Sequence, residues 1–322
     1  MKIAITGSTG LVGSALVTFL AADGHRVMRL VRAGVASGSE DIHWDPSRGE
    51  IDAARLEGLD AVVHLAGENI AARRWSDEQK ARIRDSRTQG TRFLSETLAG
   101  LRRPPRVLVS ASATGFYGSR GDEELSEESP SGSGFLAEVC RDWEAATASA
   151  ARADINVVHV RFGVILSPKG GALRKMLTPF RWGLGGRIGP GRQWMSWIAL
   201  DDALGCIRHA LSAHGLRGPV NAVAPHPVTN REFTRTLGRI LRRPTIFPMP
   251  RFMARLAFGE MADELLLAST RVMPRVLLAS GYRFLFGDLE NALRHLLGKD
   301  TPVPAATNTA PIHPERPIEA SS

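Results

Sequence analysis

Three glycines near the start of the chain have a spacing that suits a phosphate-binding turn. Gly7, Gly10 and Gly13 follow a short apolar run, residues 3–5, and precede an amphipathic run, residues 11–20. In a dinucleotide site one glycine makes the tight turn, one lets the backbone approach the pyrophosphate, and one allows close helix–strand packing. The N-terminus of the following helix then faces the anion. The predicted cofactor contacts in this turn are Gly7, Ser8, Thr9, Gly10, Leu11, Val12 and Gly13.

The next predicted strand, residues 27–31, ends in a cation. Val31 and Arg32 occupy the position at which NAD sites commonly carry an acid that binds the ribose 2′-hydroxyl. No carboxylate follows until Glu40. A guanidinium matches a 2′-phosphate in charge and geometry, so the sequence favours NADP(H) over NAD. The alternative is that Arg32 is an ordinary solvated arginine at the end of a strand.

A third apolar strand, residues 61–66, ends in small residues that would let a cofactor lie against the backbone. Its predicted cofactor contacts are His64, Leu65, Ala66 and Gly67. Glu68 follows directly, and its carboxylate either binds a ribose or substrate hydroxyl or is a loop charge. Arg161 ends another buried strand, residues 157–161. A buried charge must be paired or contact an anion, so Arg161 is a candidate for a cofactor or substrate phosphate.

These side chains need a fold that brings the ends of several strands together. Strand-like runs over residues 27–31, 61–66, 107–111 and 157–161 alternate with helical stretches over residues 76–101 and 134–151. This alternation predicts an α/β protein with a doubly wound parallel Rossmann sheet. Right-handed crossovers would place the carboxyl ends of the strands at one edge, where ligands bind.

After about residue 165 strands and helices no longer alternate regularly, which predicts a second lobe. We expect an NADP-binding Rossmann domain over residues 1–240, with substrate-lobe segments from about residue 165, and a small, mainly helical C-terminal domain over residues 241–298. Residues 299–322 are rich in Pro, Ala and Thr with few large apolar side chains, which predicts a disordered tail.

The composition of the chain argues against nucleic-acid, membrane and metal binding. The 322-residue chain has a net charge of +8, with 36 arginines and 5 lysines, but no basic run with interleaved aromatic residues. We therefore expect a small-molecule substrate and no nucleic acid. The 2 cysteines, Cys140 and Cys206, lie far apart, which suits a reducing cytoplasm. No secretory signal, membrane span or histidine metal motif is evident, so we predict a cytoplasmic protein without membrane or metal.

Several motifs in order resemble the extended short-chain dehydrogenase/reductase superfamily, which includes nucleotide-sugar epimerases. They are Thr6-Gly7-x-x-Gly10-x-x-Gly13 and residues 64–67, 109–118, 160–166 and 196–202. The chain is most similar to an atypical, epimerase-like branch that carries a small C-terminal domain of unknown function. The residues that carry this likeness are 67–70, 75, 85–87, 142–144 and 259–261.

The resemblance implies roles for further residues. Ser112 lies at the superfamily's catalytic serine position, and the alternative is a strand-end hydroxyl bonded to backbone. Ser86 and Arg87 match a cofactor-facing pair of the branch. The resemblance also implies a helix that begins near Phe135. It further implies a homodimer formed through the predicted helices over residues 76–101 and 134–151.

One departure from the superfamily concerns its proton-transfer pair, Tyr-x-x-x-Lys. The lysine of that pair lowers the tyrosine pKa, and the phenol moves a proton as hydride is transferred. This chain has 2 tyrosines, Tyr117 and Tyr282, and four residues beyond them lie Gly121 and Phe286. Tyr117 follows Ser112 in a loop, where its phenol either reaches the crevice or packs beneath the acidic loop over residues 122–128.

Two functions follow from these patterns. The first is an NADP(H)-binding, epimerase-like oxidoreductase of unknown substrate, with Ser112 or Tyr117 as the candidate acid/base. The second is a non-catalytic NADP(H)-binding sensor or scaffold.

Overall fold

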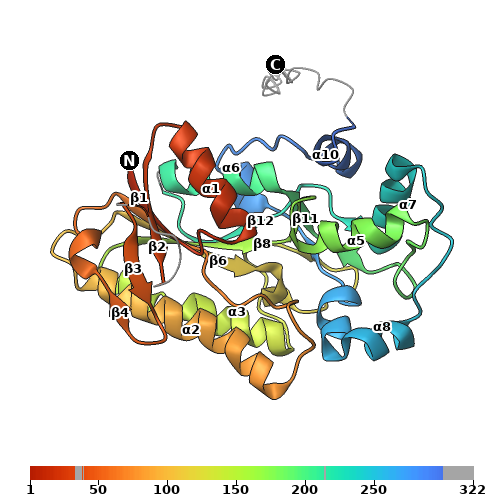
Figure 1. Ribbon diagram of the computed structural model, residues 1–322, viewed down its shortest axis with the longest axis horizontal. Coiled ribbons are helices and arrows are strands. Elements are labelled where there is room, and N and C mark those ends of the chain that lie inside the picture. Colours follow the sequence, from red (N-terminus) through yellow and green to blue (C-terminus); the bar gives the residue numbers. More distant parts are fainter. Residues whose placement is uncertain (33–37, 39, 214, 300–322) are drawn as a thin grey trace, which may run out of the picture.

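The computed structural model describes residues 1–32, 38, 40–213 and 215–299. A central eight-stranded sheet lies between two layers of helices (Figure 1). The strand order is β12-β8-β6-β5-β1-β2-β3-β4, with parallel pairing up to β3 and an antiparallel β3–β4 pair. This arrangement confirms the predicted doubly wound Rossmann sheet.

Both faces of the sheet are buried. The strands are β1 (Lys2–Thr6), β2 (Arg26–Val31), β3 (Ile42–Asp45), β4 (Glu50–Ile51), β5 (Ala61–His64), β6 (Val107–Ala113), β8 (Asn156–Phe162) and β12 (Gly218–Ala222). Side chains alternate between the two layers, so Ile3 and Ile5 enter one core while Ala4 enters the other. Burial on both sides explains why the central strands read as continuous apolar runs.

Helices α1 (Leu11–Ala22) and α6 (Leu200–Ser212) cover one face of the sheet (Figure 1). The opposite layer holds α2 (Asp77–Ala99), α3 (Phe135–Ala145) and α4 (Ala148–Arg152), and a 3₁₀ turn η1 (Ala53–Leu56) precedes β5. The predicted helix over residues 134–151 is therefore two helices. Thr147, between them, donates its hydroxyl to the carbonyl of Glu144 at 2.8 Å. Such back-bonding competes with the regular helical ladder.

The chain after β8 builds a second core beside the sheet. β9 (Val164–Leu166) pairs with β11 (Trp197–Ala199), and α5 (Gly171–Arg181) and α7 (Asn230–Leu241) pack around them with α10 (Leu289–Leu296). Helices α7 and α10 thus share a core although the domain boundary predicted at residue 240 lies between them. The sequence patterns did not predict α5 or α6.

The C-terminal segment is tied to the Rossmann domain by short strands. It contains α8 (Arg251–Phe258), the π-helical turn η3 (Ala262–Leu266), β14 (Arg271–Val272) and α9 (Arg275–Ala279). β14 pairs with β7 (Glu124–Leu125), which joins the C-terminal segment to the Rossmann domain. Outside that segment, β10 (Trp194–Met195) pairs with β13 (Val228–Thr229). Apart from Lys299, the predicted tail over residues 299–322 lies outside the described residues. Within the described chain, no helix is both long and apolar enough to cross a bilayer.

Candidate functional site

The glycine turn between β1 and α1 leaves no room for side chains at two positions. Gly7 has φ +66°, and a Cβ there would lie 2.7 Å from the carbonyl carbon of Leu65. A Cβ on Gly13 would lie 2.2 Å from the carbonyl oxygen of Gly7. The turn, the loop after β5 and the first turn of α1 are therefore packed backbone against backbone, as a dinucleotide cradle requires.

A buried hydroxyl in this turn has no partner. Ser8 is 5% exposed, and its Oγ makes no hydrogen bond in the described structure. Gly10, at the N-cap of α1, has no side chain to cap the helix. Free N–H groups at a helix start, together with an unsatisfied buried hydroxyl, suit a bound anion. The residues present therefore fit the pyrophosphate of a dinucleotide.

A chain of buried hydrogen bonds holds the turn against the end of β5. Thr6 Oγ1 accepts from the backbone N–H groups of Leu65 at 3.0 Å and Ala66 at 3.2 Å, and lies 2.7 Å from His64 Nδ1. With its acceptor sites used, the Thr6 hydroxyl donates to Nδ1, so the imidazole proton resides on Nε2 and faces Thr91 Oγ1 at 2.9 Å. Burial lowers the pKa of His64 to about 4, which keeps the ring neutral.

The loop after β5 is also anchored to α2. Glu68 donates its backbone N–H to Ser86 Oγ at 2.9 Å, and Ser86 Oγ donates to the carbonyl of Ile83 at 3.1 Å. The guanidinium of Arg87 lies 5.0 Å from the centre of the Trp143 ring. A Cβ on Gly67 would lie 3.4 Å from Arg87 Cζ. The structure thus brings Glu68, Ser86 and Arg87 together beside the glycine turn.

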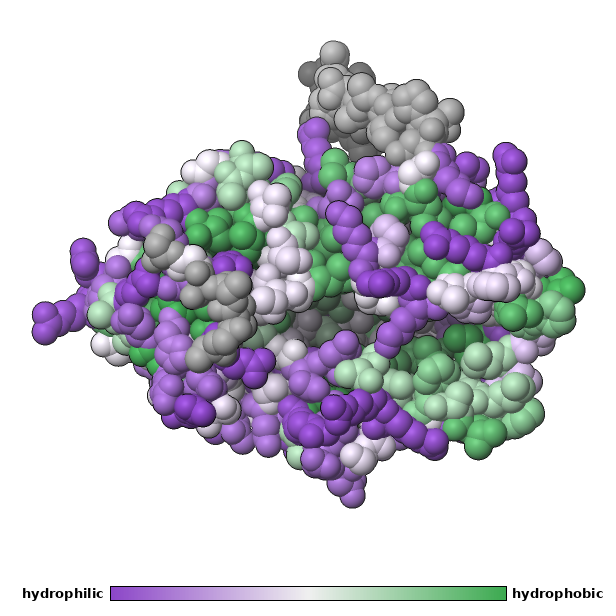
Figure 2. Space-filling view, in the orientation of Figure 1, coloured by the Kyte–Doolittle hydropathy of each residue, from purple (hydrophilic) through white to green (hydrophobic). Residues whose placement is uncertain are grey.

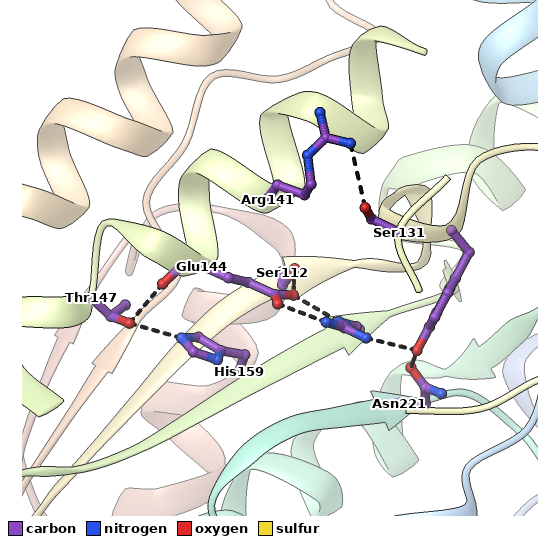
Figure 3. Close-up of polar contacts among 9 residues, drawn as sticks. Ser112, Ser131, Arg141, Glu144, Thr147, His159 and Asn221 are labelled. Atoms are coloured by element: carbon purple, nitrogen blue, oxygen red, sulfur yellow. Dashed lines mark hydrogen bonds and ion pairs between the residues drawn. The ribbon is translucent and has the colours of Figure 1, made fainter. Parts of the chain in front are cut away.

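Arg161 is paired inside the protein with the carboxylate of Glu144, which Figure 3 shows beside Ser112. Its Nε and Nη2 donate to the two carboxylate oxygens of Glu144, both at 2.7 Å, and Ser112 Oγ donates to the same carboxylate at 2.6 Å. Arg161 Cζ also lies 3.5 Å from the centre of the Phe116 ring. Burial opposes the charge of Arg161, but its bonds to Glu144 and Tyr117 outweigh burial and hold the guanidinium pKa above its usual range.

The same network continues to Asn221 of β12, which Figure 3 labels, and from there to the C-terminal segment. Arg161 Nη1 donates to the Tyr117 phenol at 3.0 Å, and this phenol, in the 3₁₀ turn η2 (Thr114–Tyr117), donates to Asn221 Oδ1 at 2.7 Å. Asn221 Nδ2 donates to the carbonyl of Met273 at 3.0 Å. Glu127 accepts from the backbone of Asn221 at 3.0 Å, while its Oε2 is buried without a partner in the described chain. Burial raises the pKa of Glu127.

The chain matches two known protein families, and the first of them agrees with a dinucleotide cradle at the glycine turn. Residues 3–222, which include the glycine turn and the Arg161 network as far as β12, match the NAD dependent epimerase/dehydratase family. The chain belongs to this family. Residues 249–296 of this epimerase family member match a further model, a domain of unknown function named DUF1731.

Similar proteins extend over nearly the whole chain. An epimerase family protein of Mycobacterium tuberculosis is 46% identical over 291 residues, which is 90% of this chain and 96% of that protein. A crystal structure of the human epimerase family protein SDR39U1 with NADPH has a TM-score of 0.84 at 36% identity, and covers 92% of this chain and 99% of that one. A structure described as a nucleoside-diphosphate sugar epimerase from Corynebacterium glutamicum has a TM-score of 0.77 at 42% identity, and covers 92% of this chain and 58% of that one.

In this epimerase family member, the two candidate acid/base residues lie inside the protein. Ser112 is 2% exposed and Tyr117 is 0% exposed. Burial raises the pKa of Tyr117, so its phenol is a neutral hydrogen-bonding group. The ring packs with Leu125 and Val272, beneath the acidic loop, which was one of the two arrangements considered for it. Catalytic roles for both residues stay predictions, as does a contact between Arg161 and a cofactor.

Arg32 lies at the carboxyl end of β2 with its side chain exposed. The nearest downstream acid in the sequence, Glu40, bonds instead to Arg26 at 2.8 and 2.9 Å. Asp41 is likewise paired with Arg29. Two of the acids downstream of β2 are thus held by arginines within the strand itself, which agrees with the expected lack of a ribose-binding carboxylate.

Sequence reasoning did not identify several residues that complete the site. Thr91, Glu127 and Asn221 carry no motif, and Glu144 appeared only within a segment of family likeness. Each meets its partner through packing between elements distant in sequence. No cluster of three or more potential metal ligands occurs among the residues that the structure describes.

Proposed function

We propose that this protein is an epimerase-like oxidoreductase that binds NADP(H) and acts on a small molecule in the cytoplasm. The observation that carries the proposal is the glycine turn, in which Gly7 and Gly13 admit no Cβ and the buried Ser8 hydroxyl lacks a partner. The human relative SDR39U1, 36% identical, was crystallised with NADPH, which supports the same cofactor here.

The preference for the phosphorylated cofactor is assigned to Arg32. An exposed guanidinium at the end of β2, with Glu40 and Asp41 both held by other arginines, suits a 2′-phosphate better than a ribose hydroxyl. The loop anchored by Thr6 and His64 places the backbone of Leu65 and Ala66 against the turn. Ser86 and Glu68 are the polar groups next to that backbone.

The bound nicotinamide would supply or accept a hydride, and the protein must supply the proton. Ser112 is the candidate we retain because it lies at the carboxyl end of β6 and shares a carboxylate with Arg161. In this arrangement Glu144 accepts from the Ser112 hydroxyl and orients it, and Arg161 holds the Glu144 carboxylate through two hydrogen bonds. Tyr117 then acts as a support for Arg161, with its phenol directed to Asn221.

A second candidate function is a non-catalytic NADP(H)-dependent sensor or scaffold. The observations that favour it are the lack of a Tyr-x-x-x-Lys pair in the sequence and the burial of Ser112 and Tyr117. Under this proposal the cofactor would change the exposure of the C-terminal lobe or its binding to a partner.

Deuterium transfer separates the two functions. The full chain is incubated with NADPH deuterated at C4 and a panel of nucleotide sugars, quinones and small carbonyl compounds. Stereospecific appearance of deuterium in one product supports the oxidoreductase. Tight NADPH binding without transfer to any of them, together with altered protease sensitivity of residues 249–296, supports the sensor. If NADPH does not bind, both proposals are wrong.

A further inference from the structure

A groove of about 670 Å³ lies in the C-terminal lobe, apart from the glycine turn and the Arg161 network. It runs between the segment over residues 187–190 and the start of α8. The residues that matter for its chemistry are Arg187, Pro248, Arg251, Phe252 and Arg255. None of them belongs to the cofactor cradle, so a ligand in this groove would bind independently of NADP(H).

The two sides of the groove are held together by backbone hydrogen bonds. Met249 donates its N–H to the carbonyl of Arg187 at 2.9 Å, and Gly189 donates to the carbonyl of Met249 at 2.8 Å. A Cβ on Gly189, which has φ +56°, would lie 3.0 Å from Arg251 Cγ. The stem of Arg251 therefore lies against the strand-like segment that carries Arg187. The two arginines therefore lie on segments whose backbones are hydrogen-bonded to each other.

The charge in the groove is not neutralised. Arg255 is paired with Asp263 at 2.9 Å. Arg187 and Arg251 have no acidic group within ion-pair distance, nor any side-chain hydrogen bond, in the part of the chain that the structure describes. Two arginines without counter-charges, held beside one groove, favour an anionic ligand, because each planar guanidinium can donate two parallel hydrogen bonds to a carboxylate or phosphate.

The surroundings of these arginines are unusually apolar. Ten large hydrophobic side chains are exposed in the described chain, and eight of them lie in residues 182–184 and 246–265. Phe252 is 69% exposed, Phe247 54% and Leu256 74%. The two segments adjoin, since a Cβ on Gly186 would overlap the carbonyl oxygen of Phe247.

Figure 2 shows hydrophobic surface gathered over α8 in the same region. Exposed apolar side chains gathered in one region favour a binding site, because leaving each of them in water forgoes about 1.5–3 kcal/mol of burial.

We propose that this groove binds a small acidic amphiphile. Its carboxylate or phosphate monoester head would lie between Arg187 and Arg251, and its hydrocarbon body would cover Phe252 and Pro248. A simple inorganic anion would leave the aromatic side chains in water, and a neutral hydrocarbon would leave the arginines without a counter-charge. One molecule that carries both features satisfies both halves of the surface.

Calorimetric titration of the full chain with decyl phosphate, kept below its micelle concentration, tests this directly. We expect one site per chain, with inorganic phosphate and decanol each at least about 10-fold weaker. The double variant R187Q/R251Q should bind at least about 10-fold more weakly, and Phe252→Ser about 3-fold or more. Arg217→Gln, at another exposed arginine, and Leu285→Ser, at a position as exposed as Phe252, serve as controls and should leave binding unchanged.

Three outcomes would overturn the proposal. One is wild-type affinity in R187Q/R251Q. Another is inorganic phosphate binding as tightly as decyl phosphate, which indicates an anion site only. The third is binding to phosphatidylglycerol vesicles without any binding of monomeric decyl phosphate, which indicates a membrane surface. Far-ultraviolet circular dichroism shows that each variant is folded. A separate titration with NADPH keeps a failure here distinct from a failure of the cofactor proposal.

Discussion

Two groups of residues have distinct roles near the site. One group forms the cofactor cradle, and the other neutralises buried charge. Gly7 and Gly13 belong to the first group because their neighbours exclude any Cβ. Arg161 and Glu144 belong to the second, with side chains only 4% and 12% exposed. A buried charge is tolerated when its partner is present and is costly when the partner is removed.

Glu144→Gln should therefore destabilise the protein far more than loss of an exposed ion pair. The change leaves Arg161 buried without a counter-charge, and we expect the free energy of unfolding to fall by about 3 kcal/mol. Urea denaturation followed by circular dichroism measures it. Glu78→Gln, which breaks an exposed pair with Arg82, is the control and should cost less than about 0.5 kcal/mol. Equal losses in the two variants would contradict the assignment.

Arg32→Ala tests cofactor preference at a single residue. If Arg32 binds the 2′-phosphate, the variant loses a charge-assisted hydrogen bond of about 1.5–3 kcal/mol, which weakens NADPH binding about 10-fold or more. NADH binding should change less than about 2-fold, since NADH lacks that phosphate. Fluorescence titration with both cofactors measures the difference, and Arg217→Ala is a control with the same loss of charge. An equal loss for NADPH and NADH would show that Arg32 does not read the phosphate.

At the scale of secondary-structure elements, the C-terminal segment contacts helices α2 and α3 of the Rossmann domain. Helix α3 begins after Gly134, which cannot cap it, and the N–H of Leu136 donates to Glu264 of η3 at 3.3 Å. Lys80 of α2 bonds to Glu260 at 2.9 Å, and Arg74 Nη1 donates to the carbonyl of Leu256 at 3.2 Å. The C-terminal lobe thus supplies a cap to a helix of the Rossmann domain.

Glu264→Ala should loosen this attachment. Removing a helix cap costs about 1 kcal/mol, and a carboxylate also interacts favourably with the N-terminal end of the helix dipole. We expect faster hydrogen exchange in the first turn of α3 and in residues 251–266, measured by mass spectrometry. Asp263→Ala, which removes a neighbouring carboxylate paired with exposed Arg255, is the matched control. Unchanged exchange at α3 in Glu264→Ala would contradict the capping role.

At the scale of the whole molecule, buried titratable groups link stability to pH. Burial lowers the pKa of His64 to about 4, below the usual value near 6.5 that it recovers on unfolding. The unfolded chain therefore binds this proton first, and the stability that neutral His64 contributes is present above about pH 6.5 and is lost as pH falls toward 4. The full loss is about 3 kcal/mol.

Unfolding of the wild-type protein and of His64→Gln at several pH values between 7 and 4 checks this link. The wild-type free energy of unfolding should fall more steeply through this window than that of the variant. Comparison within the pair isolates His64 from other buried groups, such as Glu127. Parallel curves for the wild-type protein and His64→Gln would contradict the assignment.

Local patterns in the sequence determined the cradle and most of the sheet. The glycine spacing predicts the β1–α1 turn, and the apolar runs predict β2, β5, β6 and β8 within about three residues at each end. These features depend on neighbours a few residues apart, since strands alternate every two residues and helices repeat every 3.6. The likeness to a known family added the start of α3 at Phe135.

Tertiary structure alone decided which polar groups meet. Nothing local to Arg161 names Glu144 as its partner, and nothing near Tyr117 names Asn221, which is 104 residues away. The groove beside α8 likewise exists because residues 187–189 pair with Met249. The sequence by itself therefore determined that a dinucleotide cradle is present. Long-range packing determined that Ser112 and Tyr117 lie inside a buried network, because burial and charge pairing depend on elements distant in the chain.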